Sequence, residues 1–143
     1  MSIGRRMPVR GLLADVNCEG YVRLSAGLLE ADSRRGLWQS LEFEFFEFSD
    51  VGLDVTSSDR TVWHRAQSDE MLLITANRNA RDDDSLQAVI DEQNAADSLP
   101  IITISNPRRL ARDADYANGA ADRLLEYLFD IDNYYGTGRL FLP

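Results

Sequence analysis

A nearly continuous apolar run, "MLLITA" at Met71–Ala76, constrains the fold of this 143-residue chain more than any other segment. Such a run is typical of a strand that is buried on both faces in the middle of a parallel sheet. It ends abruptly in a polar segment, "NRNARDDD", at residues 77–84. This segment is either a loop that leads to a helix cap or a metal or phosphate site at the carboxyl end of the strand.

Strand-like and helix-like patterns alternate along the rest of the chain. Strands are predicted at 9–14, 42–48, 71–76 and 99–105, with a strand-like tail at 140–143. Helices are predicted around Tyr21–Leu28, at Leu37–Leu41, at 59–68, from Leu86 past Ile90, and over a long stretch that includes Ala117 to Leu128. This alternation indicates a mainly parallel sheet with helices on both faces, in a single domain over residues 1–143.

The first two helices carry a specific expectation about burial and boundaries. Tyr21, Leu24 and Leu28 recur at helical spacing, so they are predicted to form the buried face of the first helix. The segment "SRRG", residues 33–36, is expected to end that helix before the second one begins.

Polar residues follow three of the predicted strands. Asp15, Asp50 and Asn77 fall at or just after a strand end. In open α/β sheets, ligands bind beyond the carboxyl ends of the strands, at the point where the strand order reverses. The sequence therefore predicts that polar groups from several strands meet at one edge of the sheet.

Some of these polar residues also have an ordinary structural explanation near helix starts. Asp15 is suited to cap the helix that follows it, and Asp59 is suited to the first turn of the helix 59–68. Ser57 or Ser58 is expected to cap that same helix, and one aspartate of the run 82–84 the next one. The site reading and the capping reading both stay open at this point.

Composition limits the kind of site the chain can build. Cys18 is the only cysteine and His64 the only histidine, which excludes a disulfide scaffold, a cysteine-rich zinc site and a histidine cluster. A metal would have to be held by oxygen atoms, which favours magnesium, manganese or calcium. Cys18 is interpreted as incidental and His64 as structural.

Charge and hydropathy bear on partners and compartment. Fifteen basic against 24 acidic residues give a formal net charge of -9, which lowers the expectation of sequence-independent nucleic-acid binding. All the basic residues are arginines, which suit bidentate phosphate contacts. No apolar run approaches the roughly 20 residues of a membrane helix, and the start of the chain does not resemble a signal peptide, so a cytoplasmic protein without membrane contact is expected.

Two further segments have a functional and an ordinary reading. "EFEFFEF", residues 42–48, would pair with another subunit if it lay at a sheet edge, but it also fits a half-buried strand within the monomer. Gly136 and Gly138 in "YYGTGRL" precede no predicted helix, so they are read as a turn and not as a phosphate loop.

Three motifs over residues 9–84 carry a family resemblance. A strand runs into an Asp-x-Asn element, an aspartate opens a helix with an alanine near its end, and a later strand ends in threonine. In these respects the chain resembles the PIN-like domains, compact α/β nucleases, and in particular a bacterial branch of small PIN-like proteins, the DUF5615 type. The residues that match are Asp15 and Asn17 in "LLADVNCEG", Asp59, Trp63 and Ala66 in "SSDRTVWHRAQSDEMLLIT", and Thr75 in "LLITANRNARD".

The resemblance implies a three-layer PIN-like sandwich that works as a magnesium- or manganese-dependent ribonuclease. Such proteins hydrolyse RNA phosphodiester bonds, often as the toxin of a toxin–antitoxin pair with a protein antitoxin as partner, and often as homodimers. The implied roles are catalytic for Asp15, Asp59, Asn77 and Asn79, metal-binding for Asp15, Asp59 and Asp82, and substrate-binding for Asn17, Thr75, Arg78 and Arg81.

The chain departs from the family pattern after the threonine. Relatives usually carry aspartates there, whereas this chain has Asn77 and Asn79, which bring no negative charge to a cation. The alternative hypothesis is therefore a catalytically degenerate PIN-like module that binds a protein or nucleic acid. A phosphatase reading of Asp15-x-Asn17 is remote because the chain has no lysine.

The number of converging carboxylates distinguishes the nuclease from the binding module. If Asp15 and Asp59 lie together with a third acid, a cation would relieve their mutual repulsion. If each only caps a helix, the binding module is favoured.

Overall fold

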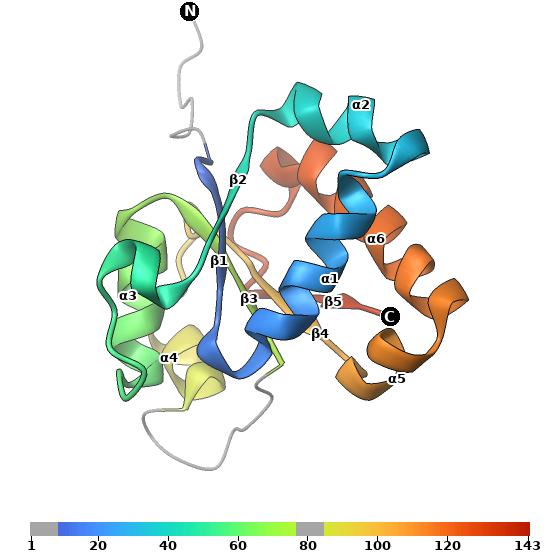
Figure 1. The fold of residues 1–143 in the computed structure, drawn as a ribbon. Coiled ribbons are helices and arrows are strands. Elements are labelled where there is room, and N and C mark those ends of the chain that lie inside the picture. Colours follow the sequence, from blue (N-terminus) through green and yellow to red (C-terminus); the bar gives the residue numbers. More distant parts are fainter. Residues whose placement is uncertain (1–8, 77–84) are drawn as a thin grey trace, which may run out of the picture.

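Five parallel strands form the central sheet, in the order β2-β1-β3-β4-β5 (Figure 1). The computed structural model describes residues 9–76 and 85–143. The strands are β1 (Gly11–Ala14), β2 (Glu44–Phe46), β3 (Met71–Thr75), β4 (Ile101–Ile104) and β5 (Arg139–Leu142). Every residue of β1, β3 and β4 is buried, and the apolar run Met71–Ala76 supplies the middle strand, β3, as predicted.

Helices cover both faces of this sheet, which makes the fold a three-layer α/β sandwich (Figure 1). One face is covered by α1, α2, α5 and α6, and the opposite face by α3 and α4. The bounds are α1 (Glu19–Leu29), α2 (Asp32–Leu41), α3 (Asp59–Ser68), α4 (Leu86–Gln93), α5 (Pro107–Arg112) and α6 (Ala114–Phe129), with short 3-10 helices η1 (Val16–Cys18), η2 (Phe48–Val51) and η3 (Ile131–Asn133).

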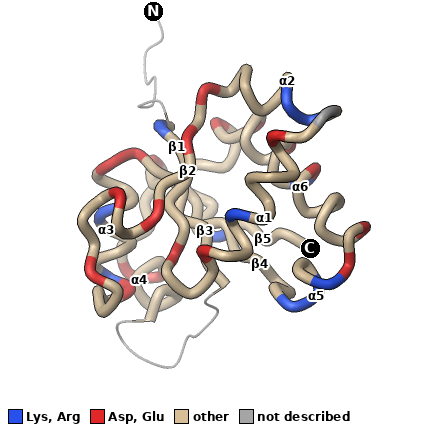
Figure 2. The backbone as a smooth tube through the Cα atoms, viewed as in Figure 1, with Lys and Arg blue, Asp and Glu red and all other residues tan. Residues whose placement is uncertain are grey.

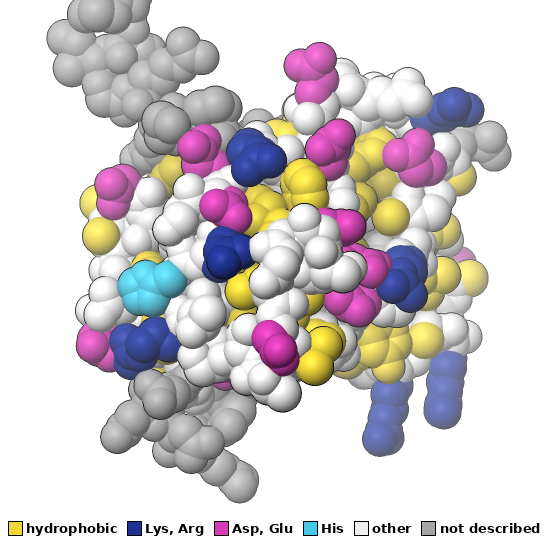
Figure 3. Space-filling model, turned by 60° about the vertical axis from the view of Figure 1, so that its left-hand side comes forward, with side chains coloured by type: hydrophobic (Ala, Val, Ile, Leu, Met, Phe, Trp, Pro, Cys, Tyr) yellow, Lys and Arg dark blue, Asp and Glu magenta, His cyan; other side chains and the backbone are white. Residues whose placement is uncertain are grey.

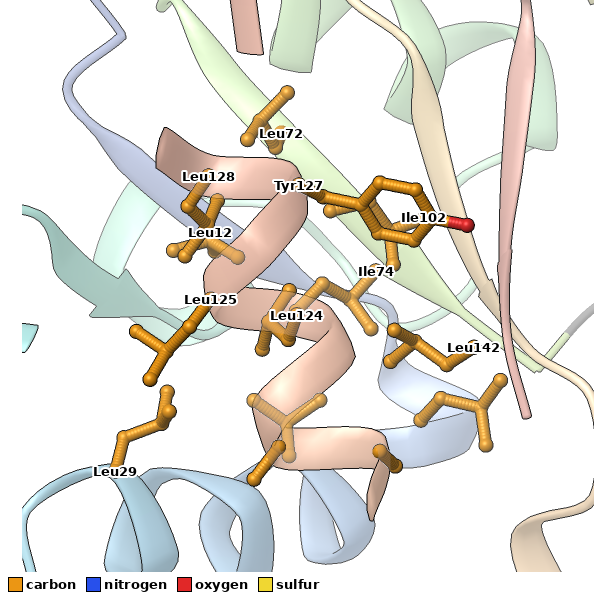
Figure 4. Close-up of a cluster of buried hydrophobic side chains, with 14 of the residues drawn as sticks. Leu12, Leu29, Leu72, Ile74, Ile102, Leu124, Leu125, Tyr127, Leu128 and Leu142 are labelled. Carbon is orange, nitrogen blue, oxygen red and sulfur yellow. The ribbon is translucent and has the colours of Figure 1, made fainter. Parts of the chain in front are cut away.

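The two cores follow from the alternation of side chains along the strands. Leu72 and Ile74 of β3 point to the α6 side of the sheet, whereas Leu73 points to the side of α3 and α4. Figure 4 shows Leu124 and Leu128 of α6 beside leucines and isoleucines of the inner strands. Because both faces of the inner strands are covered, their sequences are apolar at nearly every position.

The strand order reverses between β1 and β3. The chain leaves β1 towards β2 through α1 and α2 on one face, and it leaves β3 towards β4 through α4 on the other face. The connections therefore diverge from the carboxyl ends of these two neighbouring strands. This is the place where open α/β sheets bind ligands.

The last crossover differs in hand from the others. The connections β3–α4–β4 and β4–α5–α6–β5 both advance by one strand in the same direction, yet their helices lie on opposite faces. Since nearly all such connections are right-handed and the first three share one hand, the last is the exception. A hollow of about 420 Å³ lies beside β5, lined by residues that include Ile90, Asn94, Arg139 and Phe141.

The first two helices correct the sequence expectation. The break falls at Glu30 and Ala31, where Ala31 is extended, and "SRRG" lies inside α2, whose first residue is Asp32. The predicted buried face is also wrong in part. Leu24 is 42% exposed, and the buried stripe of α1 consists of Val22, Ser25 and Leu29, with Tyr21 and Leu28 packed at its margin.

Other element boundaries were predicted with mixed success. The strand expected at 42–48 shortens to β2, because Glu42 adopts a left-handed conformation after α2 and Phe48 begins η2. Ser58 caps α3, as predicted, but Ser85 and not an aspartate of the run 82–84 caps α4, since its side chain accepts from the Ala88 N–H. The tail joins the sheet edge as β5, and the glycines before it form the predicted turn with positive φ.

None of the helices in the described ranges combines the length and apolar character needed to cross a membrane.

Candidate functional site

Asp15 lies at the carboxyl end of β1, beside β3, at the reversal of the strand order. Its N–H continues the sheet by donating to the Ile74 carbonyl at 2.8 Å. The residue is 7% exposed, and its side chain accepts a hydrogen bond of 2.8 Å at Oδ2 from the Thr75 hydroxyl. Asp15 is the residue before η1, but its side chain makes no cap hydrogen bond there. The N–H groups of Val16 and Asn17 nevertheless lower the pKa of Asp15, so the carboxylate keeps part of a capping role in addition to its contact with Thr75.

The environment of Asp15 favours its neutral form. Burial raises the pKa of the Asp15 carboxyl above its usual value, the Thr75 hydrogen bond opposes this shift, and the negative charge of Asp59 adds to it. A buried carboxylate held close to a second acid is a common property of catalytic and metal-binding sites. The structure thus brings Asp15 and Asp59, which lie far apart in the sequence, within electrostatic reach of each other.

Asp59 reaches this edge from the start of α3. It follows the capping residue Ser58, and its Oδ2 accepts a hydrogen bond of 3.0 Å from the N–H of Leu86, the first residue of α4. Two helix N-termini therefore lie next to one carboxylate, which stabilises its negative charge. Asp59 does cap a helix, but the helix is α4 and not the one to which it belongs.

Asn17 and Cys18 complete the described part of the site. Asn17 is exposed, and its Oδ1 accepts from the Ala76 N–H at 3.4 Å, just beyond the end of β3. The thiol of Cys18 is buried and donates to the Ile74 carbonyl at 3.3 Å. Burial raises the pKa of Cys18 to about 12, with the Asp15 charge adding to the effect, so this cysteine is not a thiolate nucleophile.

The remaining predicted site residues lie outside the described residues. These are Asn77, Arg78, Asn79, Arg81 and Asp82. The described chain reaches Ala76 at the end of β3 and resumes at Ser85 before α4. Both of those positions flank the edge that carries Asp15 and Asp59.

Two other candidates do not join the site. Asp50 sits in η2, and its side chain accepts from the Glu47 N–H at 2.8 Å in a capping box. His64 is exposed on α3, where its ring packs edge-on against Trp63 at 5.0 Å (Figure 3). Their roles in the structure are local.

The donor set fits a hard divalent cation only in part. Asp15 and Asp59 supply two carboxylates with interacting charges, and carboxylate oxygens are the ligands that magnesium and manganese prefer. Within residues 9–76 and 85–143, no group of three acidic, histidine or cysteine side chains is placed to hold a metal ion. Among the described residues, a cation here would have two carboxylates, with oxygen atoms of Asn17, water or substrate as further ligands.

Sequence reasoning missed the arginines that lie along the same edge of the sheet. The helix α5 starts three residues after β4 ends, and it carries Arg108, Arg109 and Arg112. The signal was present as "SNPRRLAR", in which an asparagine cap and a proline at the first helical position follow a strand directly.

Comparison of the chain with protein-family models, curated proteins and solved structures finds no match.

Proposed function

We propose that this protein is a divalent-metal-dependent ribonuclease of the PIN-like type that hydrolyses RNA phosphodiester bonds. The observation that carries the proposal is the buried Asp15 carboxylate at the strand-order reversal between β1 and β3, held by the Thr75 hydroxyl, with the charge of Asp59 at the start of α3 adding to the rise in the pKa of Asp15. A buried carboxylate whose charge is disfavoured by burial and by a neighbouring acid gains from a nearby cation. The pair's place at the carboxyl edge agrees with where α/β sheets bind phosphorylated ligands.

Asp15 and Asp59 would hold magnesium or manganese in this proposal. When bound, the ion would supply an activated water and neutralise charge on the scissile phosphate and leaving oxygen. Thr75 occupies Oδ2 of Asp15 with its hydroxyl, which fixes the orientation of the carboxylate. Asn17 would orient water or substrate from the exposed side of the same edge.

The segment 77–84 would complete the site. Asn77 and Asn79 would act as neutral oxygen donors to water or substrate, Arg78 and Arg81 would contact phosphate, and Asp82 would be the third acidic ligand. We further propose cytoplasmic action on RNA, control by an antitoxin-like protein, and a homodimer. These three proposals rest on the family resemblance.

A catalytically degenerate binding module is the second candidate. It is favoured by the bond from the Leu86 N–H to Asp59, which gives this carboxylate a structural use without any metal. The neutral Asn77 and Asn79 point in the same direction. Such a module would bind RNA or a protein at the same edge without cutting it.

RNA cleavage by matched variants separates the two candidates. Asp15→Asn and Asp59→Asn remove the charge but keep an oxygen that can accept the bonds from Thr75 and Leu86. Asp97→Asn, on an exposed loop, is the control. We expect both site variants to lose activity on the order of a hundredfold or more, EDTA to abolish cleavage, and the control to match wild type. Metal-independent cleavage, or RNA binding by a wild type that never cuts, would reject the nuclease.

A further inference from the structure

Helix α5 concentrates positive charge in an otherwise acidic protein. Its sequence "PRRLAR" holds three exposed arginines and no acid, whereas the whole chain has a net charge of -9. Leu110 is 1% exposed and fixes the helix to the core. Figure 2 shows the basic residues of α5 together, with acidic residues common on the other helices.

This helix lies along the edge that carries the candidate site. Strands β1, β3 and β4 are parallel neighbours, so their carboxyl ends share one edge, and α5 begins just beyond the end of β4 (Figure 1). Two strand spacings, about 10 Å, separate β4 from β1 along that edge. Helix α5 also contacts α1, which starts just after Asp15 and η1.

The three arginines differ in what holds them. Arg109 forms an ion pair of 3.3 Å with Asp113, and its guanidinium lies 4.6 Å from the centre of the Tyr116 ring. It thereby joins α5 to the start of α6. Among the residues that the structure describes, Arg108 and Arg112 form no ion pair or ring contact.

Arg108 and Arg112 are four residues apart, so they lie on one side of α5. Like charges at this spacing repel each other, and Arg108 is in the first turn, where the helix dipole disfavours a cation. Arg112 in the last turn interacts favourably with the helix dipole. The repulsion between the two arginines and the position of Arg108 both lower the stability of the helix. Both features are explained if the pair binds an anion.

We propose that Arg108 and Arg112 form a phosphate-binding patch that holds the backbone of the RNA strand beyond the cleavage site. This inference rests on the proposed ribonuclease function. Guanidinium groups bind phosphate oxygens in bidentate fashion, without reading the base sequence. The patch therefore explains how a protein with a net negative charge would bind RNA. Its arginines attract the phosphates locally, at the same sheet edge that carries Asp15 and Asp59.

Polarisation of a labelled single-stranded RNA of about twelve nucleotides, in EDTA to prevent cleavage, tests the patch. The test variant is Arg108→Ala/Arg112→Ala. The control is Arg10→Ala/Arg35→Ala, which makes the same charge change with two exposed arginines, one just before β1 and one on α2. We expect the test variant to bind about 25-fold more weakly at about 0.1 M salt, with a salt slope lower by about 1.4, and the control to change little.

Cleavage assays with metal then distinguish the two proposals. With long RNA we expect the patch variant to raise KM and leave kcat unchanged, and with an RNA dinucleotide, whose single phosphate lies at the cleavage site, we expect no effect. The patch proposal would be overturned if both double variants lost RNA binding equally, or if the test variant lost none. The nuclease proposal would still be supported in that case if the wild type cleaved RNA. A wild type that neither binds nor cuts RNA would overturn both.

Discussion

The Thr75 hydroxyl donates a hydrogen bond of 2.8 Å to Asp15 Oδ2 and so joins the ends of β3 and β1. Thr75 is fully buried, and the carboxylate it contacts is nearly so. A buried hydrogen bond to a charged group is worth more than a neutral one, but only while the acceptor is ionised. This pair links the fold of the sheet to the chemistry of its edge.

Thr75→Val is expected to lower the free energy of unfolding by about 1.5–3 kcal/mol at neutral pH, because it removes the hydroxyl and keeps the shape of the side chain. It also removes an interaction that lowers the pKa of Asp15, so that pKa should rise further. Urea unfolding at neutral and acidic pH measures both effects. A loss of the same size at every pH would show that packing, and not the bond to the carboxylate, is affected.

Asp15 should make the fold less stable as pH rises. Its folded-state pKa is raised above the usual 3.8, so the folded protein binds this proton more tightly than the unfolded chain does. The stability contributed by the neutral carboxyl is therefore present at pH values below 3.8 and is lost as pH rises through the raised pKa.

Asp15→Asn tests this pH dependence in metal-free buffer. Because the variant has no charge to bury, its advantage in unfolding free energy over wild type should grow with pH and then level off. The comparison of the two proteins across the acidic range measures it. An advantage that shrinks as pH rises would contradict the raised pKa.

Asp59 has a capping role that can be separated from its charge. Asp59→Ala leaves the Leu86 N–H without its acceptor and should cost about 1 kcal/mol of stability, as loss of a helix cap does. Asp59→Asn keeps an acceptor and should cost less. Thermal unfolding of the two variants measures the difference. Ser85→Ala, which removes the other cap of α4, provides the scale.

Gly11 marks a close approach between β1 and the edge strand β2. A Cβ at this position would overlap the carbonyl oxygen of Glu44, its partner in the register. We expect Gly11→Ala to destabilise the protein by about 1–3 kcal/mol. Gly119→Ala is the matched control, since the same substitution in the middle of α6 meets no atom within 4 Å and should stabilise by about 0.5–1 kcal/mol. Chemical denaturation of both variants tests this contrast, and equal effects would argue against the tight β1–β2 contact.

The sequence predicted the layers better than the boundaries. The apolar run 71–76, the cap at Ser58 and the long helix through Ala117 to Leu128 depend on local sequence, and the structure confirms them. The break between α1 and α2 was misplaced because Gly36 reads as a helix end, although α2, which packs against α1 and α6, continues through it. Helix α5 was missed because its six residues are too short to show a period.

The candidate site was predicted by position and not by geometry. The rule that strand ends share an edge predicted that Asp15, Asp50 and Asn77 meet there. Asp15 does lie at that edge, beside Thr75, whereas Asp50 bonds to the Glu47 N–H and Asn77 lies outside the described residues. No pattern in the sequence indicates that Asp59 bonds to the Leu86 N–H. That contact depends on how α3 packs against α4. Nor does sequence spacing reveal that α5 brings Arg108 and Arg112 to the same edge, since that follows from the strand order.

Calorimetric titration of manganese or magnesium into wild type, Asp15→Asn and the control Asp97→Asn tests the central claim most directly. If Asp15 and Asp59 form a cation site, wild type and control should bind the metal with similar affinity, and Asp15→Asn should lose binding on the order of a hundredfold or more. Folding of each variant is checked by circular dichroism. Absence of binding to wild type at millimolar metal, or equal binding by Asp15→Asn, would contradict the account.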